Sequence, residues 1–182
     1  MSRAKLFWMA SALGLLVLAG ACGPDGAMEF ASQQSALELH VPGEYASIQA
    51  AITAARSGYS ILVAEGEYTE NLYLYSGLTL RGAGMDKTVL RGQIRMTSGD
   101  FSTIEGFHVT KEGAVGIGSD IGISGSGDTL RILSNLIEGF DVGLSLHEES
   151  IMEANGNVIR GNRTGVSLFE VGDWVFLRNN LI

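Results

Sequence analysis

The chain has 182 residues, enough for one domain with a sizeable core, and a formal net charge of −8 at pH 7. This acidic balance argues against a protein that binds nucleic acid or anionic membranes by charge alone. The single cysteine excludes an internal disulfide and a multi-cysteine metal site. With 25 glycines and only 2 prolines, the composition indicates many tight turns between regular strands.

The segment from Met1 to Cys22 is typical of a bacterial export signal. Arg3 and Lys5 form a basic start, and Leu6–Ala19 is an apolar run too short for a comfortable membrane span. The run leads into L-A-G-A-C, with Cys22 last. This resembles a bacterial lipoprotein signal, whose cysteine is lipidated and becomes the new N-terminus. An ordinary signal peptide with an incidental cysteine is the alternative.

This resemblance implies a processed, membrane-anchored protein. We predict a signal peptide at 1–21, a lipid-anchored tether at 22–40 and a folded domain at 41–182. Two or three acyl chains would anchor the protein stably, whereas one would not. Residue 23 is Gly rather than the Asp that retains lipoproteins at the inner membrane. We therefore expect an exported protein of the cell envelope, at the outer membrane or cell surface.

The folded domain is expected to begin with a short capping helix. Apolar residues from Ile48 to Ala55 recur at i, i+3, i+4 and i+7, which places them on one helical face. Ser47 is a suitable N-cap and Gly58 a suitable C-terminal stop. A helix with so narrow an apolar face could cover the open end of a repeat structure.

Short strands and turns follow the helix. Apolar segments predict strands at 61–63, 72–74, 78–80 and 104–110, with turns at 65–67 and 76–77. Residues 93–129 are less regular, and we expect one coil with a lateral loop there.

From Leu130 the chain repeats itself. The segment that starts at Leu130 has Asn, Ile, Gly and Leu residues that recur 22 residues later, in the segment that starts at Met152. A third copy begins at Trp174. A fixed period of this length marks a repeat architecture. Apolar and polar residues alternate within each copy, as in strands, and Gly and Asn positions between them suit tight turns. Each copy fits one coil of a parallel β-helix, whose strands stack about 4.8 Å apart.

Both copies, N-L-I-E-G-F-D-V-G-L-S-L and N-V-I-R-G-N-R-T-G-V-S-L, resemble the coil signature of the pectin-lyase-like superfamily. Residues 45–92 resemble its N-terminal cap and first coils. The resemblance implies an all-β fold: a right-handed, single-stranded parallel β-helix (a solenoid) with a short N-terminal capping helix.

The repeat predicts which side chains face inward and which face outward. The expected inward positions are Ile137, Leu144, Leu146, Ile159, Val166 and Leu168. Three charges meet the opposite sign one repeat period later: Arg131 with Glu153, Glu138 with Arg160, and Asp141 with Arg163. Such cross-strand pairs on an outer wall contribute only about 0.2–1 kcal/mol each but help to set the register.

One acidic group breaks this pattern. Glu148 and Glu170 lie one repeat period apart and carry the same charge, and Glu149 and Asp173 are close to them in the chain. Stacked like charges cost stability unless a turn separates them or a cation lies between them. We predict a solvated turn, with a weak calcium site as the alternative. No other metal or cofactor is expected.

No catalytic residues are predicted. Enzymes of the resembled superfamily act on acidic polysaccharides from a groove on the outer wall, but the motifs of pectinesterases, galacturonases and pectate lyases are missing here. We expect His40 to precede the domain, His108 to lie mid-strand and His147 to end a strand, all as ordinary wall or surface residues. Ser145 and Ser167 lack the context of a nucleophile.

Three functions remain open at this point. The first is a non-catalytic surface or periplasmic module that binds or packs along its wall, with glycan contact. The second is a fragment of a polysaccharide lyase, pectinesterase or glycoside hydrolase that acts on acidic polysaccharide. The third resembles the β-helical copper-maturation factors of nitrous-oxide reductase, but no Cys, Met or His cluster favours it.

The expected partners are the membrane, through the lipid anchor, and a polysaccharide, but not nucleic acid. The third repeat breaks off before its closing strand, so we expect an incomplete β-helix whose last covered coil exposes Gly165–Leu168. Such an open edge favours self-association or pairing with another surface.

Overall fold

The computed structural model describes residues 37–75, 77–96, 99–112, 120–126, 128–147, 151–171 and 174–182. These residues all fall in one compact unit. Cys22 and the predicted signal peptide lie outside them, as do residues 113–119, where part of the lateral loop is expected. Within the described ranges, no helix has both the length and the apolar character needed to cross a membrane.

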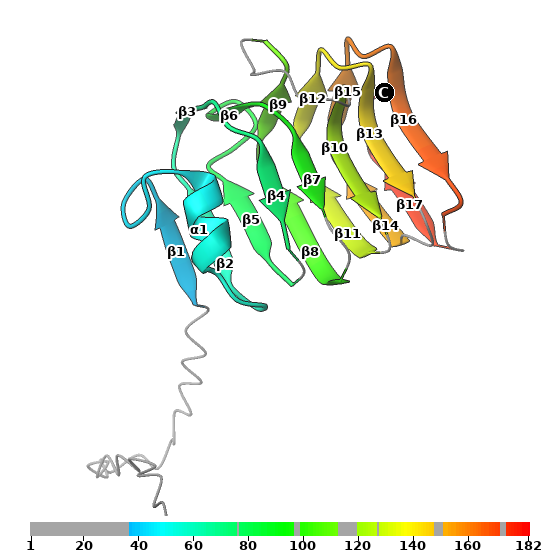
Figure 1. Ribbon diagram of the computed structural model, residues 1–182. Coiled ribbons are helices and arrows are strands. Elements are labelled where there is room, and N and C mark those ends of the chain that lie inside the picture. Colours follow the sequence, from blue (N-terminus) through cyan, green and yellow to red (C-terminus); the bar gives the residue numbers. More distant parts are fainter. Residues whose placement is uncertain are drawn as a thin grey trace, which may run out of the picture. The chain divides into compact units, whose positions relative to one another are not determined.

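The described chain is a parallel β-solenoid of about six turns with one short helix, as predicted (Figure 1). Its strands form three parallel sheets, which we number 1 to 3. Sheet 1 runs in the order β1 (Glu38–Val41), β2 (Ser60–Val63), β5 (Thr79–Gly82), β8 (Gly99–Glu105), β11 (Asp128–Leu133), β14 (Ile151–Asn155) and β17 (Val175–Arg178).

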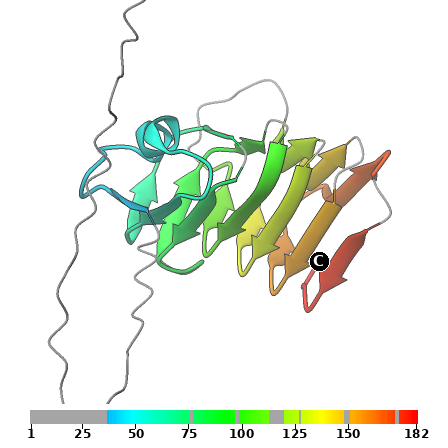
Figure 2. The same cartoon turned by 90° about the horizontal axis from the view of Figure 1, so that it is seen from below.

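Sheets 2 and 3 complete the coils. Sheet 2 runs β4 (Leu72–Leu74), β7 (Ile94–Met96), β10 (Ile121–Ser126), β13 (Val142–His147) and β16 (Thr164–Phe169). Sheet 3 runs β3 (Gly66–Tyr68), β6 (Thr88–Arg91), β9 (His108–Thr110), β12 (Leu136–Glu138) and β15 (Val158–Arg160). Figure 2 shows strands of successive coils lying side by side along the solenoid. Each coil therefore hydrogen-bonds to the coils before and after it.

The core forms because equivalent apolar residues stack in columns. Ile137 pairs in register with Ile159, and both are buried as predicted. Leu144 and Leu146 are fully buried in β13, one coil before Val166 and Leu168 of β16. Val166 is only partly buried and Leu168 is 41% exposed, because β16 is an edge strand of sheet 2 in the described chain. Val166 and Leu168 therefore keep the predicted inward orientation but are less buried than their counterparts in β13.

The helix α1 (Ile48–Ala54) covers the first coil, and it packs on β1, β2 and β4. Its N-cap is Ser47, as predicted, whose hydroxyl accepts a hydrogen bond from the Ala50 backbone N–H. The Glu70 carboxylate accepts two more from the first-turn N–H groups of Ile48 and Gln49, each at 2.9 Å. Glu70 therefore ties the helix start to the solenoid.

Several predicted boundaries are wrong. The helix ends at Ala54 with an extended Ala55 cap, whereas Gly58 (φ +89°) turns the chain three residues further on. Gly66 starts β3 rather than a turn, and Gly106 (φ +74°) divides 104–110 between β8 and β9 at a corner between sheets. His40 lies in β1, so sheet 1 begins within the predicted tether. Short apolar runs do not reveal where a coil changes wall.

A column of buried asparagines was read from the sequence only as a series of turn residues. Asn135 and Asn157 are 0% and 1% exposed and lie at the corner between sheets 1 and 3. The Asn157 Oδ1 accepts from the Asn135 backbone N–H at 2.9 Å, and its Nδ2 donates to the Ile132 carbonyl at 2.8 Å. Asn157 Nδ2 also donates to Asn180 Oδ1 in the third copy. The asparagines thus satisfy buried backbone groups where the strands are interrupted.

Candidate functional site

Most of the predicted acidic turn face lies outside the described residues. Glu148, Glu149 and Asp173 are among those not described, whereas Glu170 is exposed directly after β16 with φ of +51°. Across the described ranges, no three His, Cys, Asp or Glu side chains are grouped to hold a metal ion. The calcium alternative therefore stays a prediction.

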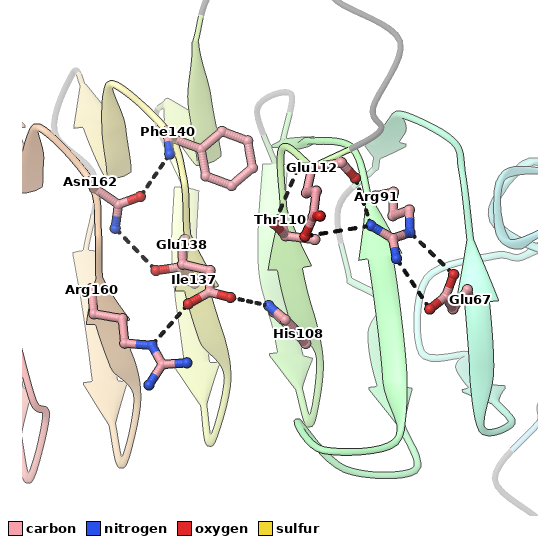
Figure 3. Close-up of polar contacts among 10 residues, drawn as sticks. All are labelled: Glu67, Arg91, His108, Thr110, Glu112, Ile137, Glu138, Phe140, Arg160 and Asn162. Carbon is pink, nitrogen blue, oxygen red and sulfur yellow. Dashed lines mark hydrogen bonds and ion pairs between the residues drawn. The ribbon is translucent and has the colours of Figure 1, made fainter.

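The candidate site is instead the outer face of sheet 3 (Figure 3). Strand alternation turns Leu90, Val109 and Ile137 into the core, so their neighbours point outward. The outward side chains include one row in which each residue pairs in register with the next: Arg91, Thr110, Glu138 and Arg160. We call this row, together with Glu67 and His108, the polar wall.

Glu138 is the centre of the polar wall. One carboxylate oxygen accepts a hydrogen bond from Arg160 Nε at 2.8 Å, and the other lies 2.9 Å from His108 Nε2. The hydrogen bond from Arg160 lowers the pKa of Glu138; burial opposes this shift, and the contact with His108 adds to it. Glu138 is therefore a carboxylate at neutral pH, and the predicted pair with Arg160 is confirmed. His108 is a member of this network rather than an isolated wall residue.

Arg91 links three coils at the other end of the wall. Its guanidinium donates to both carboxylate oxygens of Glu67, at 3.1 and 3.2 Å, and to the Glu112 backbone carbonyl at 2.8 Å. The Arg91 hydrogen bond lowers the pKa of Glu67, and the same contact raises the pKa of Arg91. This two-pronged geometry holds both side chains in one orientation.

A shallow, open groove of about 480 Å³ lies beside Glu138. The residues that line it are Thr110, Lys111, Glu112, Glu138, Gly139 and Gly161. Gly139 and Gly161 have positive φ, and nothing lies within 4 Å of a Cβ built on Gly161. The groove therefore combines the carboxylates of Glu112 and Glu138 with the Lys111 ammonium group, which is paired with Asp120, and an unobstructed glycine rim. Thr110 is only 4% exposed, and its hydroxyl accepts a hydrogen bond from the Glu112 N–H. The exposed part of this lining is suited to a ligand with many hydroxyl groups.

The sequence alone did not bring these residues together. Glu138 and Arg160 are one repeat period apart in the chain, but Thr110 and Glu138, which also pair in register, are separated by more than one period. The coil between Thr110 and Glu138 is longer than the repeat period, so comparing residues at a constant offset does not pair Thr110, Lys111 or Glu112 with the residues of the next coil. The only available signal was the polar cluster that follows the strand at 108–110.

The other predicted charge pairs are confirmed. Arg131 Nε lies 2.9 Å from Glu153, and Arg163 Nε lies 3.4 Å from Asp141. Both pairs are partly exposed and join neighbouring coils, as the sequence offset predicted.

Ser145 and His147, both in β13, form a serine–histidine contact. Ser145 Oγ lies 2.8 Å from His147 Nε2, a contact that the sequence analysis did not anticipate. Ser145 is only 2% exposed, so a substrate has no access to its hydroxyl. The contact orients side chains on the sheet surface and does not create an accessible nucleophile.

No protein-family profile matches the sequence, and no curated protein is significantly similar to it. The polar wall and its groove are therefore the features of this protein that bear on its function.

Proposed function

We propose that this protein is an exported, lipid-anchored β-solenoid that binds glycan along its polar wall and does not catalyse a reaction. The observation that supports this most is the groove beside Glu138, whose lining offers hydrogen-bond donors and acceptors in an open channel. Equivalent wall positions repeat about every 4.8 Å, roughly the length of one sugar unit, so successive sugars would meet successive polar side chains of the row. The coil signature also supports kinship with the pectin-lyase-like superfamily.

The charge state of the wall favours binding over catalysis. A glycosidase needs one carboxyl group whose raised pKa keeps it protonated as a general acid. The pKa of Glu138 is lowered instead, and both of its oxygens are already engaged by Arg160 and His108. Glu138 is thus suited to hold a network in place rather than to transfer a proton.

The groove can be blocked by one substitution with a matched control. Gly161→Asn would add a side chain over the groove, where φ is +63° and a Cβ meets open space. Gly58→Asn is the control: φ is +89°, a Cβ again meets open space, and the residue does not line the groove. Asn tolerates the left-handed region better than most residues, so neither change should unfold the protein.

Both variants and the wild type would be titrated with a polysaccharide panel that includes polygalacturonate, alginate and a neutral xylan. We expect saturable binding to at least one glycan, lost in Gly161→Asn and kept in Gly58→Asn. Absence of binding across the panel, or equal binding by both variants, would refute the proposal. The same panel would be assayed for lyase, esterase and hydrolase activity, because turnover abolished by a single carboxylate substitution would replace binding with catalysis.

Export and lipidation rest on the N-terminal sequence and need their own test. The basic start, the apolar run and L-A-G-A-C support a lipid on Cys22. Cys22→Ala should release the protein from the membrane fraction and remove the mass of the acyl chains. If Cys22→Ala fractionates with membranes like the wild type, the anchor is not at this cysteine.

A further inference from the structure

The outer face of β17 carries an exposed ladder of two aromatic rings and an arginine. Val175 and Leu177 are in register with the buried Met152 and Ala154, so the alternate residues Trp174, Phe176 and Arg178 face outward. The Trp174 and Phe176 rings stack, with centroids 6.1 Å apart and an angle of 27° between their planes. Trp174 is 60% exposed and Phe176 is 37% exposed, so the two adjacent rings form a contiguous apolar surface that is open to a ligand.

Arg178 differs from three other exposed or partly exposed arginines of the described chain. Arg131, Arg160 and Arg163 each bind a carboxylate on an adjacent coil. The contact shown for Arg178 within the described chain is with an aromatic ring, since its Cζ lies 5.0 Å from the Phe176 centroid. Stacking occupies a face of the guanidinium and leaves the N–H donors at its edge for another acceptor.

The carboxylate nearest to this ladder in the strand register is already paired with a cation. The carboxylate directly in register with Phe176 is Glu153, which is neutralised by Arg131 at 2.9 Å. The Asn155 side chain, in register with Arg178, accepts from Asn179 Nδ2 at 3.0 Å and adds amide groups beside the guanidinium. A planar apolar surface thus ends at a cation with polar neighbours.

We propose that Trp174, Phe176 and Arg178 form a subsite for an anionic sugar. The apolar face of a pyranose ring packs against an exposed aromatic ring, while a carboxylate on that sugar accepts paired hydrogen bonds from the guanidinium. This inference rests on the proposed glycan binding and adds a second contact surface, on sheet 1 rather than sheet 3. An anionic sugar is favoured over a neutral one, because the edge of the stacked Arg178 guanidinium offers paired N–H donors, which a carboxylate accepts with both of its oxygens.

Tryptophan fluorescence gives a direct readout. The chain has two tryptophans, Trp8 and Trp174, and Trp8 lies in the predicted signal peptide. Trp174 is therefore the sole reporter in the processed protein, and Trp8→Phe gives the same single reporter in a full-length chain. Oligogalacturonate should change the Trp174 emission saturably, whereas the matched neutral galactose oligomer should bind about tenfold more weakly or not at all. The lost charge-assisted hydrogen bonds account for a factor of this size. Equal binding of the charged and neutral oligomers would overturn the role of Arg178.

Calorimetry on matched variants tests each member of the ladder. Arg178→Gln and Trp174→Ala should each weaken oligogalacturonate binding by about tenfold. Arg163→Gln removes an exposed arginine that pairs with Asp141, and Phe101→Ala removes a ring 63% exposed on β8 of the same sheet. Both controls should leave the affinity unchanged. If the controls weaken binding as much as the test variants, the effect is general and the subsite is wrong.

The outcomes separate this inference from the proposed function. Binding that Gly161→Asn abolishes but Trp174→Ala and Arg178→Gln leave intact would overturn the subsite and keep glycan binding on the polar wall. No binding of any panel member by the wild type would overturn both. If Trp174→Ala leaves glycan affinity unchanged but dissociates oligomers in sedimentation, the ladder binds another copy of this chain, and the sugar subsite is wrong.

Discussion

Removing Asn157 should destabilise the fold strongly, although it is a single polar side chain. Its amide accepts a hydrogen bond from the Asn135 N–H and donates to the Ile132 carbonyl and to Asn180 Oδ1. Asn157→Ala would leave the Asn135 N–H and the Ile132 carbonyl without their side-chain partner. Water cannot replace the lost amide, because the corner is buried and Asn157 itself is 1% exposed. Each buried group left unsatisfied costs about 1–3 kcal/mol.

Two such groups give an expected loss of about 2–6 kcal/mol in the free energy of unfolding. This is a large part of the roughly 5–15 kcal/mol that stabilises a typical domain. The loss should be smaller for Asn180→Ala, about 1 kcal/mol, because Asn180 is only partly buried and water can replace its amide.

Urea denaturation followed by circular dichroism measures these differences. Asn155→Ala is the matched control, since Asn155 is only partly buried and its amide accepts from the exposed Asn179. We expect the control to stay within about 0.5 kcal/mol of the wild type. If Asn157→Ala were no more destabilising than Asn155→Ala, the asparagine column would not stabilise the coils and the reasoning would be wrong.

Four further results are expected. Leu144→Ala should cost about 2–5 kcal/mol as a fully buried truncation, whereas Glu138→Gln should cost within roughly 1 kcal/mol in urea melts at pH 7. The Arg160 hydrogen bond lowers the folded-state pKa of Glu138, so the stability from this pair is fully present above the ordinary glutamate pKa. This stability is lost as the pH falls through the lowered pKa. The wild type and Glu138→Gln should therefore have the same stability in acid melts. Gly143→Ala should be destabilising by about 1–3 kcal/mol, since a Cβ would lie 2.8 Å from the backbone of the next coil; thermal melts equal to the wild type would contradict this. The exposed apolar edge near Leu168 should promote reversible self-association, and sedimentation showing a monomer across all concentrations would contradict it.

Local sequence was sufficient to predict much of the coil. Constant spacing with strict alternation placed Ile137 and Leu144 in the core, because each coil must present the same faces to its neighbours. The same offset paired Glu138 with Arg160, and helical periodicity with a serine cap located α1. These features depend on packing between neighbouring coils, and in a repeat protein the residues that pack on each other recur at a constant spacing in the sequence.

The corners of the coils were less predictable. The asparagine positions were visible in the repeat, but an asparagine at a chain reversal can face solvent and close a turn, or face inward and bind backbone groups. Only the packed structure shows that Asn135 and Asn157 lie inside, because the hydrogen-bond partners come from three successive coils. Their burial could not follow from residue type, since isolated polar groups are costly in a core.

The sequence by itself determined the repeating coil, its inward and outward faces and the charge pairs at constant offset. The tertiary structure alone decided which polar residues share a surface. Thr110 joins Glu138 across a coil longer than the repeat period, and His108 reaches the same carboxylate as Arg160, because β-sheet register fixes the position of strands regardless of how much chain lies between them. A groove forms where such rows meet a glycine such as Gly161, and that proximity exists only once the coils have stacked.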